Sequence, residues 1–297
     1  MREIIEAIRR ADPGYTVRSI ATSGEGEDHV AYEINGELIV RRRKSTAPDE
    51  AAFDREAHLL AIVAEASPLP VPEVRFVDAA AGLIGLRKLP GESLLDHPPH
   101  APVALADQLA PLLRALRAIP SPQVEGLVDH DDHTLVGYLD GACADLDQVA
   151  PSLPPAARRA VEQFLGRPPP PEPDEVVLCH NDLGAEHILA DPATGRITGV
   201  IDWSDAALTD PARDLGRLYR DLGPATIDRI LRLDGSPVDA DGVHAAGDAV
   251  RQRAAFYARC TLLEDLRYGV ETGDRRYADA ALAGLDRTFA PLDGIEG

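Results

Sequence analysis

The segment 175–202 constrains this chain most, because it joins apolar runs typical of buried strands to residues that can move protons or bind metal ions. Its first apolar run, 176–179, leads directly into His180, Asn181 and Asp182. Polar groups that directly follow a buried strand are positioned by a rigid element, as a catalytic loop requires. The segment therefore predicts an active-site loop at the end of a strand.

Two more apolar runs in this segment are separated by residues 191–195, whose Asp-Pro-Ala-Thr-Gly composition is that of a turn. If the two runs pair as a hairpin, the chain leaves from His187 and returns at Asp202, beside the loop that holds Asp182. We therefore predict that Asp182 is a general base and that His187 and Asp202 bind a divalent cation. Each residue taken singly is also compatible with a turn cap or a strand end, but the three together favour a site.

The hydrophobic pattern divides the chain near residue 90. Residues 1–90 have strand character with one helix at 48–64, whereas residues 91–297 are mostly helical, with a two-stranded insert in the segment described above. The strand-like runs before the division are 19–33, 37–43, 74–77 and 82–86, and the helical runs after it are 104–119, 134–149, 155–165 and 211–290. We therefore predict an α+β fold with two lobes, a β-rich domain at 1–90 and a helical domain at 91–297.

Two short features of the first lobe stand out. Asn35-Gly36 separates two strand-like runs, which is a strong hairpin signal. Ser23 and Gly24 begin a glycine-containing stretch, 23–27, in which backbone N–H groups can meet phosphate oxygens. An ordinary hairpin turn explains that stretch as well, and its glutamates would repel phosphate unless they point outward. Ser23 and Gly24 are therefore candidates for binding a nucleotide.

The charge and the termini limit the partners of this chain. Asp and Glu number 50 against 30 Lys and Arg, which gives a formal charge of −20. This balance argues against a nucleic-acid partner and is compatible with a cationic small molecule. No apolar run approaches the roughly 20 residues that cross a bilayer, and residues 1–10 lack the pattern of a signal peptide. We expect a cytoplasmic monomer with no membrane partner.

The motifs around the predicted hairpin resemble those of the aminoglycoside phosphotransferase family. The residues that carry the resemblance are His180, Asp182, His187, Asp202 to Ser204 and the run Asp210-Pro-Ala-Arg-Asp-Leu215. The stretch 257–274 is also similar to a helix of the 2″-phosphotransferase subgroup. Position 187 is usually Asn in the family; the 2″-phosphotransferases and the macrolide phosphotransferases carry His there.

The resemblance implies a protein-kinase-like fold, Mg²⁺ as cofactor, and ATP or GTP as the phosphoryl donor. It places Arg41 where the family has a strand lysine, facing Glu56 on the following helix. Arg43 remains a rival, because alternate residues of a strand share a face. Lys88 and Leu89, just before Pro-Gly, resemble the hinge whose backbone groups hold the purine. The choice between ATP and GTP stays open.

The acceptor that the resemblance and the charge imply is an aminoglycoside, phosphorylated on a hydroxyl group. Each ammonium group of such a molecule needs a carboxylate or carbonyl partner once it is desolvated. Asp205 follows the predicted metal ligand closely, and Glu264 and Asp265 lie on a predicted helix. These three residues are the candidate substrate contacts; a solvated helix face is the alternative for the pair at 264 and 265.

Three other functions remain compatible with the sequence. A macrolide 2′-phosphotransferase would share the chemistry, but its large apolar substrate needs an apolar binding surface. The chain has only 12 Phe and Tyr residues and one Trp, so most of that surface would have to be aliphatic. A kinase of another small hydroxylated metabolite, such as choline or a sugar, would share the fold. A pseudokinase-like nucleotide-binding module is favoured by the missing lysine and opposed by the intact Asp182, His187 and Asp202.

Overall fold

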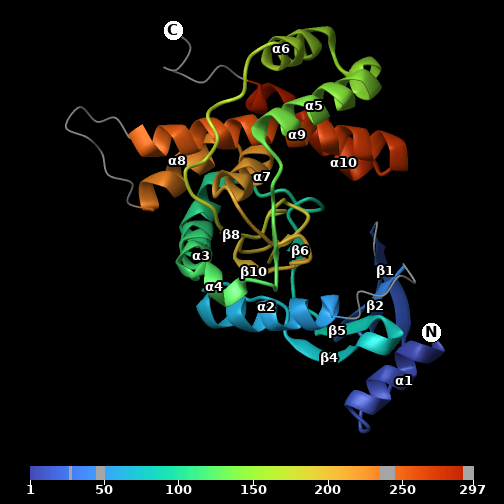
Figure 1. The fold of residues 1–297 in the computed structure, drawn as a ribbon. Helices are drawn as coiled ribbons and strands as arrows, with labels where there is room; N and C mark the ends of the chain where they lie inside the picture. The colour runs from blue at the N-terminus through green and yellow to red at the C-terminus, as the bar shows by residue number, and fades with distance from the viewer. Residues whose placement is uncertain (27–28, 45–50, 235–244, 290–297) are drawn as a thin grey trace.

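The first part of the chain forms a five-stranded antiparallel sheet. The computed structural model describes residues 1–26, 29–44, 51–234 and 245–289, and Figure 1 shows how its elements are arranged. The strand order is β1-β2-β3-β5-β4, and neighbouring strands are antiparallel. The strands are β1 (Ile20–Glu25), β2 (His29–Ile34), β3 (Leu38–Arg43), β4 (Val74–Asp78) and β5 (Leu83–Arg87). The predicted order of a β-rich part followed by a helical part is confirmed, whereas the exact boundary at residue 90 remains a prediction.

Side chains alternate along β3, and this alternation decides what each face of the sheet contacts. Leu38 and Val40 are buried in a small core with α1 (Arg2–Ala11). Arg41 lies on the opposite face, toward α2 (Ala52–Ala66), whose apolar side joins the larger core of the molecule. One strand therefore contributes both to the core of the first part and to the functional face.

The predicted turn at Asn35 and Gly36 is confirmed. Both residues have a positive φ, of 55° and 76°, and β2 and β3 pair antiparallel on either side of them. The run 19–33, however, is not one strand but two, β1 and β2, which pair with each other. Gly24 and Gly26 interrupt the apolar pattern there and carry no side chain that could pack on the sheet.

The predicted two-stranded insert is larger in the structure. The described residues contain two small three-stranded sheets, with the orders β10-β9-β6 and β7-β11-β8. Their strands are β6 (Glu92–Ser93), β7 (Asp129–His130), β8 (Val177–Cys179), β9 (Ile188–Ala190), β10 (Ile197–Val200) and β11 (Ala207–Thr209). The hairpin β9–β10 was predicted; β6, β7 and β11 were not, because strands of two or three residues are too short to show a periodic pattern.

Helices make up most of the remaining described chain. They confirm the predicted helical runs at 104–119, 134–149 and 155–165, and the described part of the run at 211–290; residues 235–244 and 290 of that run lie outside the described residues. The α-helices are α3 (Ala106–Ala118), α4 (Ser121–Val124), α5 (Leu135–Val149), α6 (Pro155–Leu165), α7 (Ala212–Leu222), α8 (Pro224–Leu233), α9 (Ala245–Thr272) and α10 (Arg275–Thr288). Short 3₁₀ turns are η1 (Ala79–Ala81), η2 (Pro102–Leu105) and η3 (Ala150–Ser152). In Figure 1 the small strands β8 and β10 lie between the sheet with α2 on one side and α5, α7, α9 and α10 on the other.

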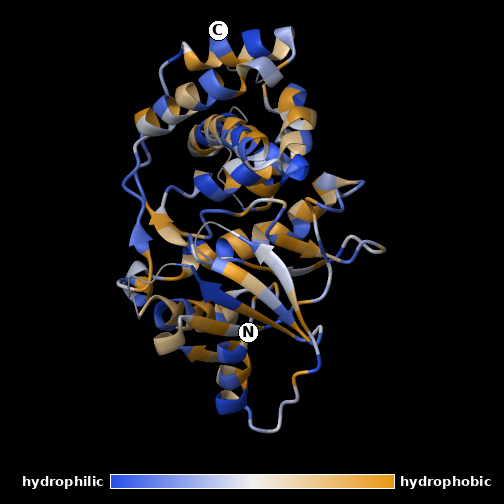
Figure 2. Cartoon of the chain, turned by 90° about the vertical axis from the view of Figure 1, so that its right-hand side faces the viewer, coloured by the Kyte–Doolittle hydropathy of each residue, from blue (hydrophilic) through white to orange (hydrophobic). Residues whose placement is uncertain are grey.

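The long helix α9 is the centre of the helical part. Phe256, Leu262, Leu263 and Leu266 are each at most 4% exposed and pack against neighbouring helices. Figure 2 shows hydrophilic and hydrophobic residues mixed along these helices, as expected where one side faces a core and the other faces solvent. In the part of the chain that the structure describes, no helix combines the length and apolarity needed to cross a membrane.

Candidate active site

The loop that follows β8 is held in place by a buried carboxylate. The backbone N–H groups of His180 and Asn181 donate to the two oxygens of Asp214, at 2.9 and 2.8 Å. Asp214 is 1% exposed and lies in the first turn of α7. Asn181 has a left-handed φ of 68°, which bends the chain immediately before Asp182. The polar loop predicted at the end of this strand is therefore present, and its anchor comes from a helix more than 30 residues away in the sequence.

His180 is buried and ties the loop to the hairpin. Its Nε2–H donates to the Ile201 carbonyl at 2.9 Å, and its Nδ1 accepts from the backbone N–H of Asp182 at 3.3 Å. Burial lowers the pKa of His180 to about 4, so the ring is neutral at pH 7 and one nitrogen is available as an acceptor. His180 is thus a support for Asp182 rather than a group that faces a ligand.

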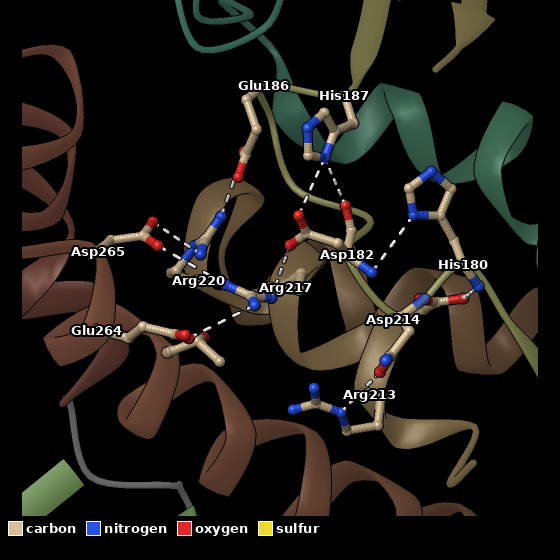
Figure 3. Close-up of polar contacts among 12 residues, drawn as sticks. His180, Asp182, Glu186, His187, Arg213, Asp214, Arg217, Arg220, Glu264 and Asp265 are labelled. Carbon is tan, nitrogen blue, oxygen red and sulfur yellow. Dashed lines mark hydrogen bonds and ion pairs between the residues drawn. The ribbon is translucent and has the colours of Figure 1, made fainter. Parts of the chain in front are cut away.

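The hairpin β9–β10 brings the three predicted residues together. His187 Nδ1 lies 2.8 Å from the carbonyl oxygen of Asp182 and 3.4 Å from its Oδ2. On the other side of the ring, His187 Nε2 lies 3.8 Å from Asp202 Oδ2. Figure 3 shows the ring of His187 directed at Asp182. The convergence of Asp182, His187 and Asp202 is confirmed; their roles as base and metal ligands remain predictions.

The arrangement of His187 and Asp202 fits a divalent cation. In the neutral ring of His187, an Nδ1–H that donates to the Asp182 carbonyl leaves the lone pair on Nε2, the atom that faces Asp202. Asp202 presents Oδ2 to that nitrogen, while its Oδ1 is bound by Arg41. A carboxylate oxygen is the ligand type that Mg²⁺ prefers. Glu186 is an additional candidate, since Asp182, Glu186 and His187 each offer a ligand atom within 4.8 Å of the others.

The charges near Asp182 favour its ionised form. Burial raises the pKa of the Asp182 carboxyl, but Arg217 and His187 lower it by more, and the pKa lies well below its usual value. Burial lowers the pKa of His187, but the carboxylates of Asp182, Glu186 and Asp202 raise it above its usual value. Asp182 is therefore a carboxylate at neutral pH and can accept a hydrogen bond from a hydroxyl group.

Arg41, and not Arg43, faces Glu56 and the predicted metal ligand Asp202. Arg41 is 7% exposed; its Nη2 forms an ion pair with Glu56, and its Nη1 lies 2.7 Å from Asp202 Oδ1. Arg43 lies over the ring of Phe53, 5.4 Å from its centroid. Burial raises the pKa of Glu56 although Arg41 opposes this. Arg41 thus links the sheet, α2 and the predicted metal ligand through two charged hydrogen bonds.

A cavity of about 280 Å³ opens beside Arg41 and contains most of the predicted nucleotide contacts. Its walls include apolar residues from both parts of the chain, Ile39, Leu86, Leu189 and Ile201. The predicted residues that line it are Ser23, Gly24, Arg41, Lys88, Leu89 and Asp202. A slot with apolar walls and a charged end suits a flat base joined to phosphates. Glu56 is the one predicted nucleotide contact outside it and acts on it through Arg41.

A second cavity, of about 380 Å³, is lined by Glu56. Phe53 and Trp203 contribute apolar wall, and Asp205 and Asp129 contribute carboxylates. Burial raises the pKa of Asp205, and the neighbouring carboxylates of the predicted base and metal ligand raise it further. Among the described residues, Asp205 has no ion-pair partner. Asp205 therefore lies near the reactive carboxylates, as predicted, and can receive a cationic group.

Glu264 and Asp265 lie on α9 and form ion pairs with two arginines of α7, Arg217 and Arg220, which connect them to the site. Arg217 Nη2 lies 3.5 Å from Glu264 Oε2, and Arg220 Nη1 lies 2.7 Å from Asp265 Oδ2. The side chain of Glu264 is 48% exposed, whereas that of Asp265 is 16% exposed. Arg217 Nε is in turn 3.2 Å from Asp182 Oδ1, as Figure 3 shows. Both predicted residues are close to the site, but only Glu264 offers an accessible carboxylate.

Sequence reasoning missed the roles of Arg217, Arg220 and Asp221. Asp221 accepts a hydrogen bond from the backbone N–H of Ala185 at 2.7 Å and so fixes the loop a second time. The sequence did contain a signal for these roles. Charged residues at positions 214, 217 and 221 have the spacing of one helix face, and they begin within the motif at 210–215. A charged stripe on one face of a helix that begins beside the catalytic segment is a candidate for lining a site.

Comparisons with known proteins agree with this geometry. Residues 20–257 match the model of the phosphotransferase enzyme family. An aminoglycoside 3′-phosphotransferase from Streptomyces fradiae is 29% identical over 224 residues, covering 64% of this chain and 76% of that protein. The GDP and kanamycin complex of APH(2″)-IIIa has a TM-score of 0.69 at 22% identity and covers 98% of this chain and 99% of its own. A macrolide 2′-phosphotransferase from Brachybacterium faecium has a TM-score of 0.61 at 23% identity, covering 97% and 99%.

Proposed function

This chain belongs to the phosphotransferase enzyme family, and from that premise we propose that it transfers the γ-phosphoryl group of ATP or GTP to a hydroxyl group of an aminoglycoside. The observation that carries the proposal is the position of Asp182. It lies at the end of a series of charged groups that begins in the nucleotide cavity with Asp202 and continues through His187. A donor in the cavity and an acceptor at Asp182 would then meet.

The reaction requires little covalent work from the protein. Asp182 accepts the hydrogen bond of the acceptor hydroxyl and takes its proton, while the hydroxyl oxygen forms a bond to the γ-phosphorus. The bond between that phosphorus and the β–γ bridging oxygen breaks, and the nucleoside diphosphate leaves. Because the transition state is loose, positioning and charge stabilisation by residues such as Arg41 supply most of the rate.

His187 and Asp202 are the proposed ligands of Mg²⁺. The bound cation would neutralise charge on the β- and γ-phosphates. The protein's own part is to hold the two ligands: His187 is oriented by the Asp182 carbonyl, and Asp202 by Arg41. In the proposed division of labour, residues 1–90 bind the nucleotide and residues 91–297 supply the base and the acceptor site.

An aminoglycoside is the proposed acceptor because the site offers carboxylates to a cation. Glu264 is accessible beside Arg217, and Asp205 has no ion-pair partner among the described residues. The net charge of −20 attracts cations over longer distances. The names of a curated relative and of a kanamycin-bound structure of the same fold support this acceptor class. A macrolide has a single amine and would use few of these carboxylates.

The test is nucleotide consumption with Mg²⁺ and either ATP or GTP, against kanamycin A, gentamicin, erythromycin and choline at equal concentrations. We expect consumption with at least one aminoglycoside and none above background with erythromycin or choline. Asp182→Asn serves as the control that separates transfer to the acceptor from contaminating hydrolysis. Phosphorylation of erythromycin alone would replace the proposed acceptor with a macrolide.

A further inference from the structure

Arg217 is a nearly buried cation whose hydrogen-bonding capacity is unused. Its side chain is 13% exposed and lies between three carboxylates, with contacts of 3.2 Å to Asp182, 3.5 Å to Glu264 and 3.7 Å to Asp265. None of these contacts has the geometry of a hydrogen bond, and within the described ranges Nε is buried without a partner. A guanidinium has five N–H donors, and leaving them unsatisfied costs free energy. Arg217 is therefore placed to donate to a further oxygen.

The order of the charged groups places Arg217 on the acceptor side of Asp182. One oxygen of Asp182 faces His187, and through it Asp202 and the nucleotide cavity. The other oxygen faces Arg217. An acceptor hydroxyl attacks in line, opposite the leaving nucleotide, so the rest of the acceptor molecule extends away from the nucleotide. Figure 3 shows Arg217 between Asp182 and Glu264, on that side.

Resting on the proposed function, we infer that Arg217 determines which hydroxyl is phosphorylated: it donates a hydrogen bond to a second hydroxyl on the carbon next to the reacting one. The acceptor group that this arrangement selects is a vicinal diol on a sugar ring. A hydroxyl whose neighbour is an amine is rejected, because the ammonium would meet the guanidinium. Arg217 is thus a specificity-determining residue that contacts the substrate.

The charges around Arg217 explain how a cationic substrate is still accepted. A guanidinium can donate to a neutral hydroxyl oxygen but repels an ammonium at the same distance. Asp265 is bound to Arg220 at 2.7 Å and is not available to a ligand ammonium. Glu264 is half exposed on the far side of Arg217 from Asp182, so it can receive an ammonium from a more distant part of the acceptor. The reacting ring and the ammonium groups are thereby separated.

Kanamycin A is a suitable probe because its hydroxyl groups differ in their neighbours. One ring carries adjacent hydroxyls at 2′, 3′ and 4′, whereas the 2″-hydroxyl lies between the anomeric carbon and an amine. We expect the product, located by phosphorus–proton NMR, to carry the phosphate on the ring with adjacent hydroxyls. Phosphate on the 2″-hydroxyl, or on any hydroxyl next to an amine, would overturn the inference and leave the proposed function intact.

Arg217→Gln tests the residue itself, with Arg267→Gln as the matched control. Arg267 also pairs with two carboxylates of the helical part, Asp145 and Glu271, at 2.6 and 2.7 Å, but lies outside the site. We expect Arg217→Gln to lower kcat/KM for kanamycin A about tenfold or more with an unchanged nucleotide KM, and Arg217→Lys to restore part of it. The Arg267 variant should match the wild-type enzyme.

When the 3′-hydroxyl, which has a hydroxyl on each side, is the one phosphorylated, two analogues identify the oxygen that Arg217 contacts. Kanamycin B has an amine in place of the 2′-hydroxyl, and 4′-deoxykanamycin A lacks the 4′-hydroxyl. We expect the wild-type enzyme to discriminate against one of them about tenfold, and Arg217→Gln to lose that discrimination. Equal rates with all three acceptors, or a preference that persists in the variant, would overturn the inference. If none of the three were phosphorylated but gentamicin was, the inference would fail and the proposed function would stand; if no aminoglycoside were phosphorylated, both would fail.

Discussion

The two sides of Asp182 differ in how much open space and how many ion pairs they contain. The nucleotide side is an open cavity whose charged end is formed by one arginine, Arg41, and two carboxylates, Glu56 and Asp202. On the proposed acceptor side, Asp205 lines a second cavity, but Arg217 and other charged residues of α7 and α9 form a layer of ion pairs in which they neutralise one another. From this difference we expect a preformed site for the nucleotide, and an acceptor that replaces existing ion-pair partners within a charged network.

The largest effect is expected at Asp182, where the two sides meet. Asp182→Asn keeps the shape of the side chain but cannot accept a proton, so kcat should fall about a hundredfold or more. Nucleotide affinity, measured by calorimetry, should stay within about twofold because that side is untouched. Turnover close to that of the wild-type enzyme would show that Asp182 is not the base.

Removal of a proposed metal ligand should be the next largest effect and should fall on the nucleotide side alone. Asp202→Ala deletes a carboxylate that also binds Arg41, and we expect Mg²⁺-dependent nucleotide affinity to drop about thirtyfold or more. His187→Asn should keep most of the affinity, because the Asn side chain offers an oxygen. Unchanged affinity in Asp202→Ala would remove this residue from the metal site.

A smaller effect is expected from the arginine that closes the nucleotide side. Arg41→Ala should raise the nucleotide KM about tenfold, since a partly buried charged pair with Glu56 and Asp202 is lost. Arg43→Ala, its matched control two residues along the same strand, should change the nucleotide KM by less than about twofold. The opposite ranking of the two variants would mean that the faces of β3 are assigned wrongly.

The smallest effect is expected at Glu264, on the acceptor side. Glu264→Gln should raise the aminoglycoside KM about threefold and leave the nucleotide KM unchanged, because an exposed charge pair contributes little. The change should shrink as salt is added, since screening already weakens exposed pairs.

Asp265→Asn provides the contrast with Glu264. Its carboxylate is nearly buried against Arg220, so the substitution removes one of the three carboxylates that balance this buried cation. The expected loss is therefore in thermal stability, seen as a lower Tm, more than in the KM of the acceptor. A raised acceptor KM with an unchanged Tm would show that Asp265 contacts the substrate directly.

Sequence reasoning predicted which residues converge at the proposed nucleotide side and at Asp182, because they lie in or beside short motifs. The hairpin β9–β10 was predicted from two apolar runs and a turn, and its geometry alone brings His187 back to Asp202. Ser23, Gly24, Lys88 and Leu89 all line one cavity as expected.

Sequence reasoning predicted fewer of the contacts on the proposed acceptor side, because these contacts join residues far apart in the chain. The carboxylate of Asp265 has the charge expected of a contact to a cationic substrate, but its packing against Arg220 leaves it little exposed. The difference between Asp265 and its neighbour Glu264 arises from the rotation of α9 against α7. A charge count or a helical pattern does not report that rotation.

By itself the sequence determined that a β-rich part precedes a helical part, and it determined the polar loop after β8 and the hairpin that follows it. These features depend on local preferences: apolar periodicity, turn-forming residues and the strand ends at which polar groups collect. Only the tertiary structure decided that Arg41 rather than Arg43 meets Asp202, and that Arg217 lies beside Asp182. Several arginines and carboxylates of this chain have similar chemistry, and the packing of helix and strand faces selects which of them pair. An ion pair forms only where the fold brings the two charges within a few ångströms.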